Sequence, residues 1–213
     1  MNFKRISLGF VTLWCLLWPI VSQPPRPDGF WYDEEAEVEK ALLIEAFFDP
    51  VCPDSRDSWP PLKQVVQEFA SRVRLVVHTF PLPYHDNAFA TSRALHITNR
   101  LKNTSATYHL LEAFFNHQEQ FYGKATFNKS RSVVTDHIVE FTANELGSSY
   151  RSAIKSGFNE TNTDLATRYA FKYGCIRGVY GTPFFFVNGF PLPDAGSPLN
   201  YIGWRKVLDP LLR

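Results

Sequence analysis

The residue with the clearest potential for chemistry is Cys52, which stands between an apolar run and an amphipathic segment. Residues 41–48 are almost all apolar and predict a buried strand, whereas residues 58–73 have the spacing of a helix with one apolar face. The free backbone N–H groups and the positive dipole at a helix start stabilise an anion. A cysteine at that junction therefore tends to be more reactive, since the thiolate is the nucleophile. Pro53 suits the first helical position, where a missing N–H costs nothing.

A second stretch, residues 178–189, has the pattern of a loop that enters a strand and then turns back. Thr182 and Pro183 precede the apolar run Phe184-Phe185-Phe186-Val187, which we interpret as a core strand. The following Asn188-Gly189 is a strong signal for a two-residue hairpin turn. These residues predict a short antiparallel hairpin directly after the proline.

Together the two stretches resemble the DsbA-like branch of the thioredoxin superfamily, and the resemblance covers most of the chain after about Lys40. In that branch a Cys-Pro-x-Cys motif opens the first helix, and a Thr–cis-Pro or Val–cis-Pro loop faces it. The resemblance implies an α/β thioredoxin-like fold with a mixed central β-sheet flanked by helices and an inserted all-helical subdomain. It also implies catalytic roles for Cys52, Ser55 and Pro183, and substrate contacts from Pro53, Asp54 and Thr182.

The sequence departs from that branch at Ser55, which stands where the second cysteine of the pair would be. A hydroxyl cannot resolve a mixed disulfide, although it can donate a hydrogen bond to the Cys52 thiolate or cap the helix. The remaining chemistry is that of a monothiol: attack on an exposed disulfide, then release by a thiol of the same substrate or by glutathione. We therefore expect disulfide isomerisation or deglutathionylation rather than net oxidation.

Other functions stay open because the charges around Cys52 are mixed. Arg56 favours the thiolate, and three acidic residues oppose it, namely Asp49, Asp54 and Asp57. With an unreactive cysteine, the chain would be a non-catalytic, chaperone-like module that holds extended peptides beside Pro183 by strand addition. A glutathione enzyme resembling the kappa-class transferases is a third reading, which the predicted signal peptide disfavours. The expected partners are protein or peptide thiols and disulfides, and glutathione.

The order of the periodic segments predicts a thioredoxin core that is split by helices. A strand at 41–48, a helix and a strand at 73–80 form one parallel unit. Helical spacing then fills about 86–176, before the strand that follows Pro183. The resulting domain spans residues 40–213.

Proline and capping residues give the expected helix boundaries. Pro60-Pro61 is expected to kink or restart the first helix. Asp86 is the expected cap of the first inserted helix, and Ser197-Pro198 of the last helix.

The N-terminus has the features of a secretory signal. Residues 1–22 combine Lys4 and Arg5 with an apolar run that is shorter than the ~20 residues of a membrane span, so cleavage is favoured over an anchor. Residues 23–39 are interpreted as an extended arm. Three glycosylation sequons follow, at Asn103, Asn128 and Asn159. We expect a glycoprotein of the endoplasmic reticulum lumen or the extracellular space, without stable membrane insertion after cleavage.

The composition of the chain narrows the classes of function that remain open. A chain of 213 residues that is 45% hydrophobic can bury the core of one domain, and a net charge of +1 without a basic cluster gives no indication of nucleic-acid binding. The histidines form no metal-binding pattern, so neither metal nor cofactor is expected. Cys15 falls within the predicted signal. Cys175 has three fates: a buried free thiol, which is the usual case, a bond to Cys52, or a remote resolving thiol.

Overall fold

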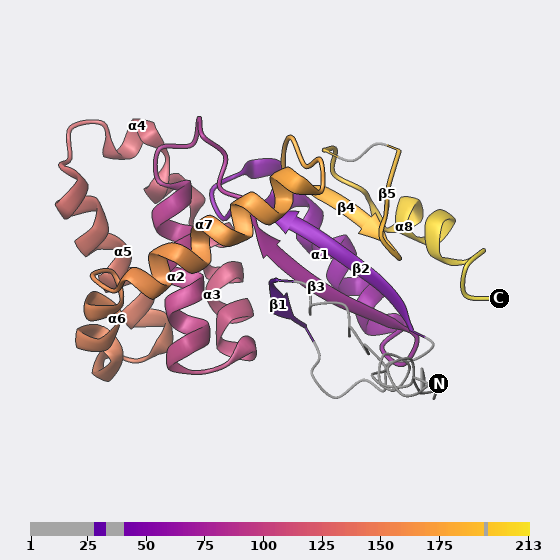
Figure 1. Ribbon diagram of the computed structural model, residues 1–213, viewed down its shortest axis with the longest axis horizontal. Helices are drawn as coiled ribbons and strands as arrows, with labels where there is room; N and C mark the ends of the chain where they lie inside the picture. The colour runs from indigo at the N-terminus through magenta and orange to yellow at the C-terminus, as the bar shows by residue number, and fades with distance from the viewer. Residues whose placement is uncertain (1–27, 33–40, 194–195) are drawn as a thin grey trace, which may run out of the picture.

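The computed structural model describes residues 28–32, 41–193 and 196–213, and the predicted signal peptide lies outside them. These residues form a five-stranded sheet of order β1-β3-β2-β4-β5. The strands are β1 (Phe30–Trp31), β2 (Leu42–Phe48), β3 (Val73–Thr79), β4 (Phe184–Val187) and β5 (Phe190–Pro191). Strands β2 and β3 are parallel and all other pairings are antiparallel, so the predicted mixed sheet is confirmed (Figure 1).

Helices cover the sheet on both faces. The helix α1 (Pro53–Glu68) connects β2 to β3 and packs against α8 (Tyr201–Leu208) behind the sheet in Figure 1. The helix α7 (Thr161–Ile176) runs in front and contacts β3. Because β2 and β3 are covered from both sides, nearly every residue of these strands is buried, which explains their continuous apolar character.

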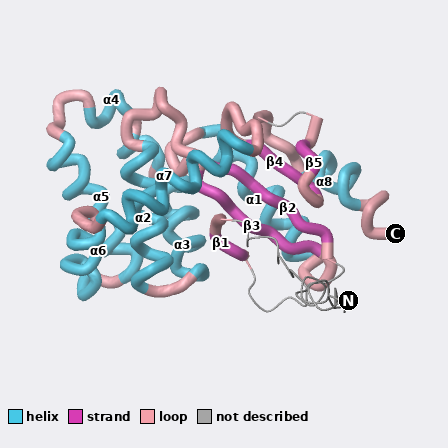
Figure 2. Tube along the Cα trace, in the orientation of Figure 1, coloured by secondary structure: helices cyan, strands magenta, loops and turns pink. Residues whose placement is uncertain are grey.

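The helical insertion predicted between the two parts of the core is confirmed. It forms a group of helices beside one end of the sheet (Figure 2). Its members are α2 (Ala88–Leu101), α3 (Thr104–Asn116), η1 (Gln118–Phe121), α4 (Gly123–Thr126), α5 (Arg131–Leu146), η2 (Ser148–Tyr150) and α6 (Arg151–Gly157). The helix α7 belongs to both parts, since it contacts α2 in the insertion and β3 in the sheet.

The expected N-terminal arm contributes a strand that the sequence did not predict. Phe30 and Trp31 pair with Val77 and Val76 of β3 at the edge of the sheet. The hydroxyl of Tyr108 on α3 donates a hydrogen bond of 2.7 Å to the carbonyl of Phe30. The described part of the arm is therefore attached to both the sheet and the insertion.

Three boundary expectations differ from the structure. The helix α1 does not restart at Pro60-Pro61 but continues through them, and its apolar face, including Trp59, Leu62 and Val65, stays buried. The N-cap of α2 is Asn87 rather than Asp86.

The last helix begins later than expected. Its N-cap is Asn200, not Ser197, because the Asn200 side chain accepts a hydrogen bond of 2.8 Å from the Gly203 amide.

The hairpin prediction is confirmed. Asn188 and Gly189 connect β4 to β5 with positive φ angles of 48° and 82°, the region that a two-residue turn of this kind requires. The Asn188 carboxamide also accepts a hydrogen bond of 2.8 Å from the Leu43 amide. The turn thereby fixes β4 beside β2 and places the start of β4 near the end of β2.

Candidate functional site

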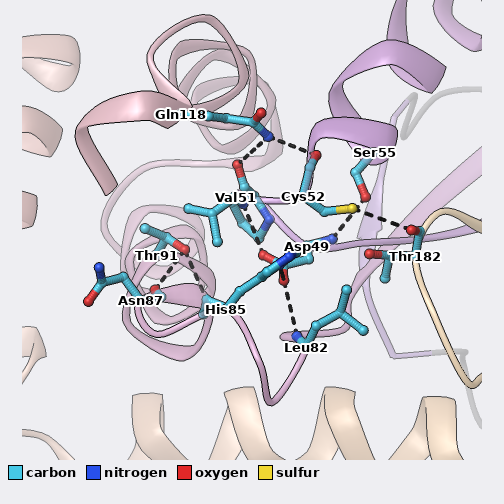
Figure 3. A network of polar contacts seen from close by, with 12 residues as sticks. Asp49, Val51, Cys52, Ser55, Leu82, His85, Asn87, Thr91, Gln118 and Thr182 are labelled. Carbon is cyan, nitrogen blue, oxygen red and sulfur yellow. Dashed lines mark hydrogen bonds and ion pairs between the residues drawn. The ribbon is translucent and has the colours of Figure 1, made fainter. Parts of the chain in front are cut away.

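Cys52 lies at the junction that the sequence predicted. It is the N-cap of α1, in extended conformation, and Pro53 is the first helical residue. Its thiol donates a hydrogen bond to the carbonyl oxygen of Thr182, with 3.4 Å between sulfur and oxygen (Figure 3). Cys52 exposes only 3% of its surface, so access to the sulfur is restricted in this conformation.

The loop before β4 brings Pro183 to the same place. The peptide bond between Thr182 and Pro183 is cis. Thr182 is buried, and its hydroxyl has no hydrogen-bond partner within the described part of the chain. Two segments that are 130 residues apart thus meet at the sulfur of Cys52, as the predicted juxtaposition of Cys52 and Pro183 requires.

Ser55 makes another contact in this conformation than those that its position suggested. Its side chain is fully buried, and its oxygen accepts a hydrogen bond of 3.3 Å from the Asp49 backbone amide. The start of α1 has no side-chain cap hydrogen bond. In this conformation the hydroxyl ties the first turn of the helix to the end of the preceding strand.

Charged side chains lie on the exposed surface around the cysteine motif. Pro53 and Asp54 are exposed at the helix start, where a substrate could contact them. Arg56 forms an ion pair of 2.8 Å with the adjacent Asp57. The positive charge that could have assisted a thiolate at Cys52 is therefore partly neutralised by its neighbour.

The Asp49 side chain makes three polar contacts beside the motif. It is fully buried, and its carboxylate accepts hydrogen bonds from the amides of Val51 at 2.9 Å and Leu82 at 3.1 Å. A third contact, of 2.7 Å, joins its Oδ2 atom to Nδ1 of His85. Sequence reasoning treated Asp49 only as an unfavourable charge and missed His85, because no local spacing indicates a partner so far along the chain.

Gln118 from η1 is a second residue that the sequence did not indicate. Its Nε2 donates hydrogen bonds to the carbonyls of Pro50, at 3.0 Å, and Cys52, at 2.8 Å. The side chain is fully buried. The insertion thus holds the backbone of the cysteine loop directly.

A pocket of about 290 Å³ lies beside the motif. Its wall includes Val51 and Pro53, the two neighbours of Cys52, together with Tyr84, His85 and Tyr122. Burial and then the charge of Cys52 raise the pKa of Tyr84. Burial raises the pKa of Tyr122 as well, and the charge of Cys52 also contributes there. Both tyrosines are therefore within electrostatic reach of Cys52.

Another buried carboxylate, Glu45, lies on β2 and is paired with a cation. Arg177 donates two hydrogen bonds to it, of 2.8 and 2.9 Å, and Tyr173 donates one of 3.0 Å. Burial opposes the charged form, but His78, Arg177 and Tyr173 outweigh it and lower the pKa of Glu45 to about 2.

Cys175 is exposed and free, so the expectation of a buried thiol was wrong. It lies in the last turn of α7, whose buried residues are Thr163, Thr167, Ala170 and Gly174. Gly174 faces the sheet, which turns its neighbour Cys175 outward. No bond joins the two cysteines.

The three sequon asparagines, Asn103, Asn128 and Asn159, are all exposed. Asn103 also caps α3, and its side-chain oxygen accepts the amide of Ala106 at 2.9 Å. This contact leaves the side-chain nitrogen, the atom that carries a glycan, available. Within the described ranges, no helix could span a membrane and no group of side chains could hold a metal ion.

The fold and the site together define a thioredoxin-fold protein with a helical insertion, in which a cysteine at the first helix start faces a cis-proline loop. Residues 43–200 match the DsbA-like thioredoxin domain, and the chain belongs to that family. No curated protein matches the chain in sequence.

Solved structures share the architecture. A Pseudomonas syringae protein proposed to be a protein-disulfide isomerase has 17% identity and a TM-score of 0.70, over 85% of this chain and 98% of that one. The thiol-disulfide exchange protein alpha-DsbA2 of Wolbachia pipientis has 14% identity and a TM-score of 0.63, over 86% of this chain and 87% of that one. The thiol-disulfide oxidoreductase MdbA of Corynebacterium diphtheriae has 11% identity and a TM-score of 0.62, over 78% of this chain and 85% of that one. At these identities the likeness concerns the fold alone.

Proposed function

We propose that the protein is a secretory-pathway thiol enzyme that exchanges disulfides through Cys52 alone. The observation that carries the proposal is the contact between the Cys52 thiol, at the start of α1, and the loop that contains the cis-Pro183 bond. Membership of the DsbA-like family and the thiol chemistry named for its structural neighbours support the same reading. The substrates are protein or peptide disulfides.

The proposed reaction has two steps. The Cys52 thiolate attacks one sulfur of a substrate disulfide, the S–S bond breaks, and the other sulfur leaves as a thiolate. Ser55 has no sulfur with which to expel the bound partner, so a substrate thiol or glutathione must attack the mixed disulfide and regenerate Cys52. No net oxidation occurs when the attacking thiol comes from the same substrate, and the result is isomerisation.

Substrate access requires a local change at Cys52. The thiol donates to the Thr182 carbonyl, and a thiolate cannot donate, so ionisation turns the 3.4 Å contact into a repulsion. The N–H groups at the start of α1 act in the opposite direction and stabilise the anion. We propose that ionisation moves the sulfur away from Thr182 and toward the exposed surface at Pro53 and Asp54.

A second candidate is a non-catalytic peptide-binding module. The burial of Cys52 favours it. The exposed aromatic side chains of Tyr180 and Phe190 favour it as well. In the sequence Tyr180 precedes β4 and Phe190 follows it. Such a module would bind an extended peptide beside Pro183 without covalent attachment.

The test is covalent trapping with a disulfide-bearing peptide, read on non-reducing gels with the attachment site mapped by mass spectrometry. Because Cys175 is exposed and can react on its own, the reference protein carries Cys175→Ala. The expected result is a peptide adduct at Cys52 in that protein and none after Cys52→Ala. Peptide binding that persists without any adduct would instead support the non-catalytic module.

The secretory location is proposed from the predicted signal peptide and the three exposed sequons. In a eukaryotic secretory host we expect the mature chain to start near Gln23 and to carry sugar on Asn103, Asn128 or Asn159. N-terminal sequencing and glycosidase treatment check both points. An intact Met1 and an unchanged gel mobility would contradict the proposal.

A further inference from the structure

The contact between Asp49 and His85 fixes the chemical state of the imidazole. Two backbone amides donate hydrogen bonds to the Asp49 carboxylate, and the ring nitrogen Nδ1 of His85 lies 2.7 Å from its Oδ2 atom. An ionised carboxylate only accepts, so Nδ1 must carry a proton. In neutral His85 the other ring nitrogen, Nε2, is then a proton acceptor. The partner that fixes this arrangement is fully buried, whereas His85 is partly exposed.

His85 lies in the wall of the pocket that adjoins the cysteine. Residues on both sides of Cys52 line the same pocket, as do Tyr84 and Tyr122. In Figure 3 the Asp49 carboxylate lies between the His85 ring and the Leu82 amide, below the loop that carries Cys52. A group that leaves a disulfide attacked at Cys52, or a thiol that arrives to displace it, can occupy this pocket.

We propose that His85, oriented by Asp49, transfers protons to and from the substrate thiol in the exchange reaction at Cys52. The inference rests on the proposed monothiol function and adds the group that makes release by an external thiol efficient. His85 is then a catalytic residue, and Asp49 is its positioning residue.

The proton balance defines the two tasks of His85. When Cys52 attacks, the departing sulfur receives both electrons of the S–S bond, and protonated His85 gives its Nε2 proton to that thiolate. When the external thiol arrives, neutral His85 removes its proton. The resulting thiolate attacks the mixed disulfide and Cys52 leaves with the electron pair.

The missing second cysteine gives this step its importance. A resolving cysteine in a Cys-x-x-Cys pair is held beside the first, and its position accelerates release. With Ser55 in its place, release of the bound partner depends on a free thiol. Such a thiol has a pKa of about 8.5 and is mostly protonated at neutral pH. A base in the pocket raises the fraction of this thiol that is deprotonated and can attack the mixed disulfide.

Several charged or titratable groups face His85 and contribute to any pH profile. Asp49 comes from the end of β2, and Tyr84 and Asp86 belong to the same loop as His85. Tyr122 faces it from the insertion. On the other side a second pocket of about 440 Å³, which His85 also lines, contains Arg168 and Lys172 of α7.

The test isolates the release step. In the Cys175→Ala protein a mixed disulfide between Cys52 and glutathione is formed with an activated glutathione disulfide, and its reduction by a small thiol is followed by intact-mass spectrometry from pH 6 to 10. We expect His85→Gln to slow release by about a hundredfold at neutral pH, the scale of general acid–base catalysis. The deficit should vanish above the pKa of the attacking thiol, where no base is needed.

The controls separate catalysis from structure. His117→Gln, at an exposed histidine of the insertion, should leave the release rate unchanged. Added imidazole should restore release in His85→Ala but not accelerate the reference protein, and Asp49→Asn should move the pH profile. Equal release rates in His85→Gln and reference protein at neutral pH would overturn the inference while leaving the proposed function intact. Failure of the activated disulfide to form an adduct at Cys52 would instead overturn the proposed function.

Discussion

Glu45, in the middle of β2, and Asp49, directly after its end, are two buried carboxylates that each lie near a histidine, yet their surroundings differ. Arg177 holds Glu45 in a bidentate ion pair. Backbone amides and His85 hold Asp49, and that histidine borders a pocket beside Cys52. The first pairing fixes a charge with a permanently charged partner, which suits stability. The second places an imidazole, which no permanently charged partner holds, at the pocket beside the cysteine loop, as the proposed proton transfer requires.

The two histidines show the same contrast. His78 is completely buried, and neither of its ring nitrogens has a hydrogen-bond partner among the residues that the structure describes; its Nε2 atom is 3.6 Å from the Glu45 carboxylate. Its ring stacks on Phe47 instead. His85 has one strong partner and a partly exposed ring. Of these two histidines, His85 is the one whose ring another molecule can contact.

The largest expected effect on stability comes from Arg177→Ala. The change leaves Glu45 buried without its cation, so we expect a loss of about 3 kcal/mol in the free energy of unfolding. The matched control is Arg100→Ala, whose ion pair with Glu160 is exposed on both sides and should cost less than about 1 kcal/mol. Urea denaturation measures both. Equal effects of the two substitutions would remove the distinction between a structural and a surface pair.

Acid should destabilise the protein through the same carboxylate. Folding lowers the pKa of Glu45 from 4.5 to about 2. The stabilisation is therefore fully present above pH 4.5 and is lost as the pH falls toward 2. Its size is about 3 kcal/mol, from the shift of the pKa. Denaturation at several pH values should show that slope, and Glu45→Gln should flatten it. A slope that persists unchanged in Glu45→Gln would assign it to other groups.

A smaller effect on stability is expected for His85→Gln. Asp49 keeps both of its backbone donors, so only one hydrogen bond to a charged group is lost, at a cost of about 2 kcal/mol. The same denaturation experiment tests this. A loss as large as that of Arg177→Ala would mean that His85 supports the fold in the way that Arg177 does.

The sequence predicted the features that have local signals. Cys52 followed by Pro53 marks a helix start, Pro183 precedes an apolar strand, and Asn188-Gly189 makes a hairpin. In each case neighbouring residues determine the conformation, so a short stretch is enough to recognise it.

The contacts that surround the site could not be predicted in the same way. His85 meets Asp49 because the loop between β3 and α2 passes beside the end of β2, and Gln118 meets the backbone of Cys52 because the insertion folds back onto the cysteine loop. Such pairings depend on packing between distant segments and have no sequence period. The exposure of Cys175 was missed for a related reason, since it depends on which side of α7 faces the sheet.

The lifetime of the mixed disulfide at Cys52 tests the monothiol account most directly. In the Cys175→Ala protein, a peptide adduct at Cys52 should persist until a thiol is added, because Ser55 cannot expel the peptide. Ser55→Cys should restore a resolving thiol and release the peptide without any added reductant, as intact-mass spectrometry over time would show. An adduct that decays equally fast in both proteins, with no thiol present, would contradict the account.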